Sequence, residues 1–399
     1  MDILIVAEYL DNIKNPVSYN SRFLTIADLL VAKGHTVRIA TTDFIHSSKQ
    51  HISGVDSYKG CELKALHEPG YPRNVCIKRF YSHYVLSKNL KKWLENVRKP
   101  DVIYCAVPSL DFAYEAAKFA KKHNIKLITD IQDLWPEAFE MVLNIPLISR
   151  LIFTPFRWRA KYLYRTADKV VAVSQTYINR ALQERNDKSG CKAVFLGTDL
   201  SRFDSYKAEA PALVKQENDL WLGYVGTLGH SYDMKTVFDA MVLLKDKDYY
   251  DRLKFVIVGD GPLKSEFEQY SKEKNLNVCF TGMQPYPNMV STLCRCDIAI
   301  NPIKKKSAGS IINKHGDYAA SGIPVINTQE SPEYRQLVEE YGMGLNCKCE
   351  NASDVADKID KLLKSKELRT QMGAQARKCA EERFDRNHTY SEIIKAIEN

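Results

Sequence analysis

Short apolar runs typical of buried strands alternate with segments of helical periodicity along almost all of the 399 residues. Strands joined in this way are expected to be parallel, because a parallel pair needs a long crossover, which is usually a helix. The pattern therefore predicts an α/β fold built on doubly wound parallel sheets. In the first half the expected strands are residues 3–7, 37–40, 101–106, 126–130, 169–173 and 192–196, and the expected helices are 21–33 and 112–123.

A second series of the same kind follows a polar stretch. Residues 205–218 lack apolar periodicity and contain Pro211, which predicts an interdomain linker. A chain of this length also exceeds the size at which a single hydrophobic core stops growing, so two domains are expected. Beyond the linker the expected strands are 221–225, 253–258, 278–281, 298–300 and 324–327, and the expected helices are 235–244, 263–274, 314–320 and 352–363.

The two series predict two doubly wound, Rossmann-like domains that face each other across a cleft. We expect residues 1–204 to form the N-terminal domain, 205–218 the linker and 219–382 the C-terminal domain. The last expected helix, about 383–398, can pack on either domain, so residues 383–399 could complete the N-terminal one. Because such folds bind ligands at the carboxyl ends of their strands, the cleft is the expected active site.

The expected compartment is the cytoplasm. The chain begins with a short apolar run after Asp2, which suits a buried strand better than a secretory signal, and no apolar run approaches the ~20 residues that span a bilayer. The ten cysteines show no framework spacing, as expected in a reducing compartment. Cys294-x-Cys296 and Cys347-x-Cys349 look like metal half-sites, but no second pair or histidine cluster stands at zinc spacing, so buried thiols are favoured.

The positive charge is concentrated in the N-terminal half. Residues 1–200 carry 29 Lys and Arg against 20 Asp and Glu, whereas the remaining residues carry 28 against 29. This asymmetry points to an anionic partner of that half, or to uneven surface charge without function. Basic and aromatic residues alternate in 75–99 and 147–165, which favours peripheral contact with an anionic membrane. The alternative is helices packed on the core with their cationic ends in water, and no nucleic-acid-reading motif is present.

The segment 301–325 has the composition of a phosphate and ribose site. A strand runs into a small-residue loop that contains Gly309 and Ser310, whose backbone N–H groups can face a phosphate at a helix N-terminus. Lys314 and Asp317 lie three residues apart and share one helix face, so a lysine could face phosphates while a carboxylate accepts both ribose hydroxyls. A solvated loop with a surface ion pair is the alternative, and it is favoured for residues 304–306 taken singly.

A glycine turn at Gly226-Thr227-Leu-Gly229 also follows a strand and precedes a helix. Glycine lets backbone N–H groups approach a ligand, and the helix dipole favours its phosphates, although an ordinary turn would have the same composition. The pattern is not a dinucleotide fingerprint. A second turn, Gly259-Asp-Gly-Pro262, is explained by proline at a helix start.

The order of several motifs resembles the GT-B glycosyltransferases of family 4, and the resemblance covers nearly the whole chain. In the C-terminal half the motifs are Gly226-Thr-Leu-Gly, Val258-Gly-Asp-Gly-Pro, Phe280-Thr-Gly-Met, Cys296-Asp-Ile-Ala-Ile-Asn-Pro and Asp317-Tyr-Ala-Ala-Ser-Gly-Ile-Pro-Val. In the N-terminal half they are Gly34-His-Thr-Val, Asp130-Ile-Gln-Asp133-Leu-Trp-Pro-Glu137, Ala167-Asp-Lys-Val-Val-Ala-Val-Ser174 and Leu196-Gly-Thr-Asp199.

The resemblance implies a site for a nucleotide-sugar. The family's Glu-x7-Glu pair contacts the donor, and here its second position is Asp317, for the ribose, while its first is Gly309. The usual Arg and Lys of the first glycine loop are replaced by Thr227 and roughly Tyr232. Lys304 and Lys314 are therefore the candidates for the displaced phosphate charge. The base is expected near Gly282 and Met283, against backbone.

Asp130 and Asp133 are the candidate catalytic residues, because they follow a strand whose carboxyl end should face the cleft. A carboxylate there could orient or deprotonate an acceptor hydroxyl, although Asp133 could equally cap a helix. No metal or other cofactor is expected to be essential, since lysines and helix dipoles can stabilise a leaving diphosphate. Asp246-x-Asp248 resembles the metal motif of the other glycosyltransferase fold, but it lies in a polar loop and is discounted.

The residues and the resemblance together favour a glycosyltransferase, a hexosyltransferase that moves a sugar from a nucleoside diphosphate, with UDP as the expected nucleotide. The resemblance alone implies that the enzyme is retaining. The acceptor is a hydroxyl, and a lipid-diphosphate-linked saccharide of cell-surface polysaccharide synthesis is the candidate. Two alternatives stay open. A degenerate transferase could act as a nucleotide-binding partner subunit, as Gly309 in place of an acid suggests, or the protein could be a nucleotide-sugar epimerase.

Overall fold

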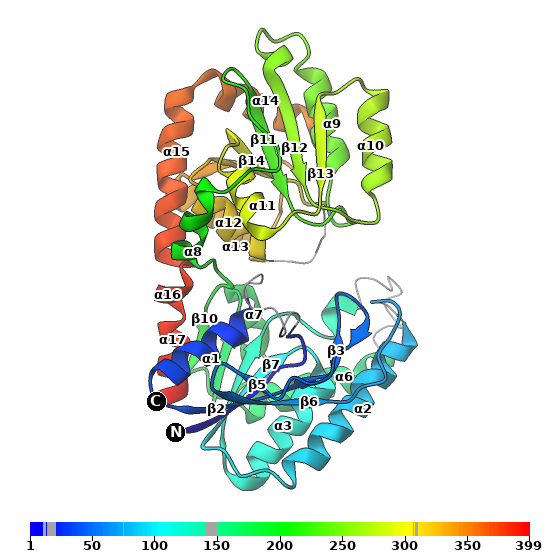
Figure 1. Ribbon diagram of the computed structural model, residues 1–399, viewed down its shortest axis with the longest axis vertical. Coiled ribbons are helices and arrows are strands. Elements are labelled where there is room, and N and C mark those ends of the chain that lie inside the picture. Colours follow the sequence, from blue (N-terminus) through cyan, green and yellow to red (C-terminus); the bar gives the residue numbers. More distant parts are fainter. Residues whose placement is uncertain (11–12, 14–20, 75, 140–150, 306, 308–309) are drawn as a thin grey trace. The chain divides into compact units, whose positions relative to one another are not determined.

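The protein is described by a computed structural model, which describes all residues except 11–12, 14–20, 75, 140–150, 306 and 308–309 (Figure 1). The chain divides into two compact units. Unit 1 comprises Met1–Phe195 together with Tyr390–Asn399, and unit 2 comprises Leu196–Thr389. None of the helices in the described ranges is long and apolar enough to cross a membrane.

Unit 1 contains an eight-stranded sheet in the order β10-β9-β8-β7-β1-β2-β6-β5. All neighbouring strands are parallel except β5, which pairs antiparallel with β6 at the edge. A short antiparallel hairpin of β3 and β4 stands apart from this sheet. The strands are β1 (Asp2–Val6), β2 (Thr36–Thr42), β3 (Phe44–Ile45), β4 (Gln50–His51), β5 (Ser57–Tyr58), β6 (Cys61–Leu66), β7 (Val102–Val107), β8 (Lys126–Ile131), β9 (Lys169–Ala172) and β10 (Cys191–Ala193).

Helices cover both faces of this sheet. One apolar core lies under α2 (Ile77–Leu94), α3 (Leu110–His123) and α6 (Thr154–Thr166), and α7 (Gln175–Leu182) packs at its side. A second core lies on the other face, under α1 (Arg22–Ala32) and α17 (Ser391–Glu398), which lie side by side (Figure 1). The last helix of the chain therefore completes unit 1, one of the two possibilities that the sequence left open.

Unit 2 contains a six-stranded parallel sheet in the order β13-β12-β11-β14-β15-β16. In chain order this is 3-2-1-4-5-6, so the direction of winding reverses between β11 and β14. The strands are β11 (Leu220–Val225), β12 (Leu253–Val258), β13 (Val278–Gly282), β14 (Ile298–Asn301), β15 (Val325–Asn327) and β16 (Gly344–Asn346). The helices are α8 (Leu200–Ser205), α9 (Met234–Leu243), α10 (Lys264–Glu273), α11 (Tyr286–Leu293), α12 (Asn313–Ser321), α13 (Pro332–Tyr341), α14 (Ala352–Lys364), α15 (Lys366–Cys379) and α16 (Arg386–Thr389).

The unit boundary differs from the predicted one. The chain enters unit 2 after Phe195 rather than after residue 204, and the stretch 205–218 lies within unit 2. Hydrogen bonds explain the difference, because the Ala212 N–H donates to Thr292 on α11 at 2.7 Å, and Arg377 on α15 donates twice to Asp204 at 2.7 Å. The polar composition of residues 205–218 indicates a surface segment, but it does not indicate to which of the two units the segment is hydrogen-bonded.

Two further predictions concern the end of the chain and the thiols. The single helix expected at 383–398 is broken, because the Thr198 N–H donates to the Phe384 carbonyl at 2.8 Å and the Arg386 N–H donates to the Thr198 carbonyl at 3.1 Å. All ten cysteines are free thiols. Of the two Cys-x-Cys pairs for which buried thiols were predicted, Cys296 and Cys347 are buried, while Cys294 and Cys349 are half-buried.

Candidate functional site

The winding of the unit 2 sheet reverses at β11 and β14, and this is where doubly wound sheets bind ligands. Gly226 follows β11 directly, and Asn301 is the last residue of β14. Helix α12 begins at Asn313 and carries Lys314 in its first turn. The turn after β11 and the start of α12 therefore build one site from segments far apart in the sequence.

Gly226 makes room for the ammonium group of Lys314. Its φ angle is +131°, and a Cβ atom placed on it would lie 3.0 Å from the Lys314 Nζ atom. A Cβ atom on Gly259, in the next turn, would lie 1.9 Å from the Gly226 carbonyl oxygen, so the two turns touch through backbone. As its composition suggested, the glycine turn allows a polar group to approach the backbone closely. In this structure that group is the amino group of Lys314.

The side chain of Lys314 is buried, and its amino group lies between two aromatic rings. Its Nζ atom lies 4.1 Å from the ring centre of Tyr224 and 4.0 Å from that of Tyr232. Among the described residues Nζ finds no hydrogen-bond partner, and burial lowers the pKa of Lys314 well below its usual value. Contacts with aromatic faces recover only part of the cost of burying a charge. The position is therefore strongly favourable for an anion.

Asp317 lies one helical turn beyond Lys314. Its Oδ1 atom accepts hydrogen bonds from the Thr198 hydroxyl at 2.9 Å and the Tyr286 hydroxyl at 2.8 Å. Burial raises the pKa of Asp317, and these two hydrogen bonds oppose that rise. Within the described ranges no donor reaches Oδ2, so one carboxylate oxygen is oriented by the protein and the other can accept from a ligand hydroxyl.

The predicted base-binding residues end the neighbouring strands. Gly282 is the last residue of β13, with a φ of +72°, and its carbonyl accepts the Gly259 N–H at 2.9 Å. Met283 follows with a side chain that is 81% exposed. Thr227 is exposed, and its carbonyl accepts the Tyr224 hydroxyl at 2.7 Å. The glycine turns after β11, β12 and β13 thus form one continuous edge, and base contact at Met283 stays a prediction.

The loop before α12 differs from its prediction. Gly309 lies outside the described residues, and α12 begins at Asn313, so Ser310 does not open the helix. The Ser310 hydroxyl instead donates to Glu333 at 2.6 Å, and its carbonyl accepts from Gln329 at 2.9 Å. The exposed Lys304 is fixed through its backbone, since its N–H donates to the Ser231 carbonyl at 3.0 Å.

His315 organises the start of α12, and the sequence did not single it out. The Ile312 N–H donates to its Nδ1 atom at 3.3 Å, and its ring stacks on Tyr334 with centroids 3.4 Å apart. Burial and the neighbouring charge of Lys314 hold the pKa of His315 well below its usual value, so the imidazole is neutral. The only signal in the sequence was its place between Lys314 and Asp317.

In unit 1 the candidate Asp130 is completely buried at the end of β8. Its carboxylate accepts from Arg22 Nε at 2.6 Å and Arg22 Nη2 at 3.2 Å, from the Tyr104 hydroxyl, and from Gln132 at 2.8 Å. Arg22 also donates to the Val194 carbonyl at 2.9 Å. Through Arg22, Asp130 therefore links α1 and the segment after β10 to the sheet. Its catalytic role stays a prediction, and none of these contacts supports it.

Asp133 is half-buried in the turn after β8. Its Oδ1 atom accepts the Leu134 N–H at 2.9 Å, and burial raises the pKa of its carboxyl group against the effect of hydrogen bonds from Leu134 and Trp135. The carboxylate thus caps its own turn, and the general-base interpretation is still a prediction. Trp135 of the same motif stacks on His83, with centroids 5.6 Å apart, and Glu137 pairs with Arg180.

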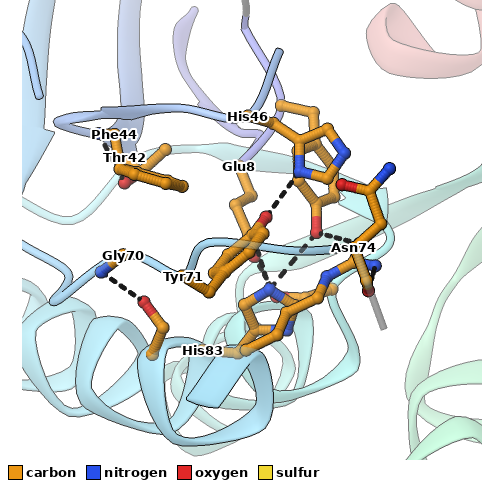
Figure 2. A network of polar contacts seen from close by, with 12 residues as sticks. Glu8, Thr42, Phe44, His46, Gly70, Tyr71, Asn74 and His83 are labelled. Atoms are coloured by element: carbon orange, nitrogen blue, oxygen red, sulfur yellow. Dashed lines mark hydrogen bonds and ion pairs between the residues drawn. The ribbon is translucent and has the colours of Figure 1, made fainter. Parts of the chain in front are cut away.

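The winding of the unit 1 sheet reverses between β1 and β7, and a polar cluster occupies this point. Glu8 follows β1, is fully buried and accepts a hydrogen bond from Ser109, which follows β7. His83 Nε2 lies 3.1 Å from Glu8 Oε1. Burial alone would raise the pKa of Glu8, but the charge of His83 and the surrounding hydrogen bonds outweigh it and lower that pKa. Figure 2 shows Glu8 and His83 at the centre of this network.

We call this network the Glu8 cluster; it comprises Glu8, Tyr9, Tyr71, Arg79, His83 and Ser109. Arg79 donates to the Tyr9 hydroxyl at 2.9 Å and lies over the Trp135 ring at 4.9 Å. The β3–β4 hairpin adds His46, whose Nδ1 is 2.6 Å from the Tyr71 hydroxyl (Figure 2). None of these residues was predicted as a site residue, and Arg79 and His83 fall in the stretch 75–99 that was expected to contact a membrane. The position of Glu8 directly after a strand is the signal that could have identified the cluster, once the strand order was known.

Two family models together match almost all of the chain. Glycosyltransferase Family 4 matches residues 20–202, and Glycosyl transferases group 1 matches residues 205–379. N-acetyl-alpha-D-glucosaminyl L-malate synthase of Bacillus anthracis is 30% identical over 291 residues, which cover 71% of this chain and 70% of the relative.

A further sequence relative and a solved structure are also similar to this chain. An uncharacterized glycosyltransferase of Methanocaldococcus jannaschii is 25% identical over 219 residues, which cover 54% of this chain and only 56% of the relative's length. The crystal structure of Anabaena HepE in complex with UDP covers all of both chains with a TM-score of 0.71 and 16% identity.

Proposed function

Because this chain belongs to the GT-B glycosyltransferases of family 4, we propose that it transfers a sugar from a nucleoside diphosphate to a hydroxyl acceptor. One observation carries the proposal. The buried ammonium of Lys314, with no hydrogen-bond partner among the described residues, lies beneath Gly226 and one turn from the half-satisfied carboxylate of Asp317. A cation and a hydroxyl acceptor on one helix face match the diphosphate and the ribose of a nucleotide.

Lys314 would bind the diphosphate. A phosphate at the Gly226 turn would give the buried ammonium its missing partner and would also meet the N-terminus of α12. The same contacts would stabilise the charge that develops on the leaving diphosphate during transfer. This arrangement supplies positive charge without a metal ion at the diphosphate.

Asp317 would bind the ribose, with Oδ2 accepting from the hydroxyls while Thr198 and Tyr286 hold Oδ1. UDP is the proposed nucleotide, which is supported by the structures of Anabaena HepE with UDP and with UDP-glucose. The base would lie on the glycine edge beside Met283. Retention of anomeric configuration is the part of the proposal that rests on family membership alone, through same-face transfer in which the leaving phosphate helps to deprotonate the acceptor.

The acceptor would bind unit 1, and a lipid-diphosphate-linked saccharide at an anionic membrane is the proposed class. Large apolar side chains are exposed on and beside α2 and α6, which flank α3 on one face of the unit 1 sheet. Residue 75 and residues 147–150 of the two predicted stretches lie outside the described residues. The exposed fractions are 87% for Ile77, 57% for Tyr81, 49% for Tyr84, 78% for Leu151, 55% for Ile152 and 60% for Trp158.

The test is UDP binding by Lys314→Met, measured by calorimetry together with thermal unfolding. A charge-assisted hydrogen bond is worth about 1.5–3 kcal/mol, so the affinity for UDP should fall by roughly 10- to 100-fold. The same variant should unfold at a higher temperature without ligand, because methionine removes the cost of a buried charge. A lysine with a purely structural role would not produce both effects.

The matched control is Lys272→Met, an exposed lysine of α10, for which both UDP affinity and melting temperature should be unchanged. Lys304→Met decides whether the second predicted lysine contributes to phosphate binding. Unchanged UDP affinity in Lys314→Met would refute the proposed phosphate site. Tight UDP binding by the native protein, without turnover of any nucleotide-sugar and acceptor, would favour a binding subunit, and isomerisation without acceptor would favour an epimerase.

A further inference from the structure

Three potential metal ligands of unit 1 converge on one point. Asp43 follows β2, His51 is the last residue of β4, and His67 follows β6. Their nearest ligand atoms all lie within 4.8 Å of one another. We propose that Asp43, His51 and His67 bind a divalent transition-metal ion of the Zn²⁺ class.

Both imidazole rings direct the same nitrogen toward the same carboxylate. His51 Nδ1 lies 3.1 Å from Asp43 Oδ1, and His67 Nδ1 lies 2.8 Å from Asp43 Oδ2. A tetrahedral Zn²⁺ with bonds of about 2.0–2.2 Å needs ligand atoms roughly 3.4 Å apart, so the widest separation must close by about 1.4 Å. The two histidine side chains are 42% and 65% exposed, so ring rotation can provide this movement.

The backbone holds Asp43 in place between the elements that carry the histidines. Its N–H donates to the Leu66 carbonyl at 2.9 Å, and its carbonyl accepts the Ile52 N–H at 2.7 Å. The Glu68 N–H donates to Oδ1 at 3.1 Å, which orients the carboxylate as outer hydrogen bonds do in metal sites. Asp43 is thus held in a fixed position, while the side chains of His51 and His67 can rotate toward a bound ion.

The ligand set determines the class of ion. Two imidazoles and one carboxylate suit Zn²⁺, Fe²⁺, Co²⁺ or Ni²⁺, whereas Mg²⁺ and Ca²⁺ prefer oxygen ligands. Three protein ligands leave at least one position for water.

Metal binding would stiffen the hairpin beside the Glu8 cluster. Phe44 of β3 pairs with His51 of β4. An ion bound by both His51 and His67 would therefore link the hairpin to the end of β6. The loop of that hairpin carries His46, which contacts Tyr71, and Lys49, whose Nζ donates to Asn74 at 2.6 Å (Figure 2). The ion would thereby hold these side chains over the cluster, with no part in the transfer step proposed above.

The first experiment is a Co²⁺ titration of the full chain, followed by visible absorption. We expect one equivalent to give d–d bands without an intense thiolate charge-transfer band, which separates this site from the ten free cysteines. The double variant His51→Gln/His67→Gln and the single variant Asp43→Asn should each bind Co²⁺ at least 10-fold more weakly. The control His123→Gln should bind it as the native chain does.

A second measurement follows hydrogen exchange in residues 44–51, which should slow at least several-fold when Zn²⁺ is added to the native chain and not to Asp43→Asn. Equal Co²⁺ affinity in the native chain and both ligand variants would overturn the proposal. A thiolate band or no binding at all would do the same, and would leave the three side chains as a hydrogen-bonded His–Asp–His group. Far-UV circular dichroism verifies that the variants are folded.

Discussion

Lys314 and Gly226 are both recognisable in the sequence, but their relation is not. A glycine after a strand predicts close approach of some group, and a lysine at a helix start predicts an anion site. Only the fold places the Lys314 ammonium 3.0 Å from where a Gly226 side chain would begin. The fold thus explains both residues: Gly226 has no side chain because the Lys314 amino group lies beside it, and together they form one candidate anion site.

For Asp130, by contrast, the position in the sequence suggested a role that its contacts do not support. Its position at the end of a strand correctly placed it at the ligand-binding edge of a parallel sheet. A strand position does not say whether a side chain points outward or across the sheet to a neighbour, and Asp130 reaches Tyr104 on β7 and Arg22 on α1. The rule that ligands bind at strand ends therefore identified the right edge of the sheet but not the right residue. Glu8, which follows β1, is the acid that lies where the winding reverses.

Glu68 provides a pH prediction. Burial, together with the charges of Glu8 and Asp43, raises its pKa to about 9, compared with 4.5 for an ordinary glutamate. Between these values the folded chain keeps a proton that the unfolded chain releases, so this group stabilises the fold at pH 4 and that contribution is lost as the pH rises through 9. Glu68→Gln, which cannot ionise, should therefore melt more than roughly 10 °C above the native chain at pH 9 and at the same temperature at pH 4.

The magnitude follows from about 1.4 kcal/mol per pKa unit and roughly 2–4 °C per kcal/mol for a unit of this size. Thermal melts at a series of pH values provide the measurement, with Glu62→Gln as control because Glu62 is exposed on β6. A difference between Glu68→Gln and the native chain that does not change with pH would contradict the assignment.

At the scale of elements, apolar strands were predictable, whereas amphipathic strands and strands of two residues were not. Strand β1 is buried at all five positions, as its apolar run indicated. Strand β6 alternates between buried and exposed positions, because it lies next to the sheet edge with only β5 beyond it. The β3–β4 hairpin has two residues per strand, too few for any period, and it carries His51, one of the three ligands of the proposed metal site.

Helices α2 and α6 allow the membrane proposal to be tested. Ile77→Ser/Trp158→Ser removes two large exposed apolar side chains without touching the core. Interfacial binding scales with buried apolar area plus attraction to anionic lipid, so co-sedimentation with anionic vesicles at low salt should weaken by roughly 10-fold. Val214→Ser, an equally exposed apolar residue of unit 2, should have no effect.

High salt should weaken vesicle binding by the native chain as well, since exposed charges are screened over a Debye length of about 10 Å at 0.1 M. Vesicle binding that is equal in Ile77→Ser/Trp158→Ser and the native chain would exclude these helices as the contact surface. Failure of the native chain to bind at low salt would remove the membrane part of the proposed function and leave the nucleotide site untouched.

At the scale of the whole molecule, the chain leaves unit 1 after Phe195 and returns to it at Tyr390. Deleting residues 391–399 should therefore unfold unit 1 and spare unit 2. The deletion removes Ile393, Ile394 and Ile397, which are fully buried. Each contributes about 1.5–3 kcal/mol, a sum comparable with the total stability of about 5–15 kcal/mol of a domain.

Calorimetry with and without UDP can follow the two units separately. The truncated chain should lose the transition of unit 1 or show it at least 10 °C lower, while the transition that UDP stabilises is retained. Lys395→Ala, on the exposed side of α17, should leave both transitions unchanged. Loss of the UDP-dependent transition in the truncated chain would mean that α17 supports both units.

Local sequence patterns were sufficient to predict the two parallel α/β units, most strand positions and the helix that carries Lys314 and Asp317. These depend on local periods of two and 3.6 residues and on motif order, which a linear chain displays directly. Three facts became known from the folded chain alone: Lys314 lies under Gly226 between two tyrosines, Asp130 is bound by Arg22, and the last helix packs on unit 1. Strand order and helix packing bring these groups together across long stretches of chain, and no local pattern encodes which side chains will meet.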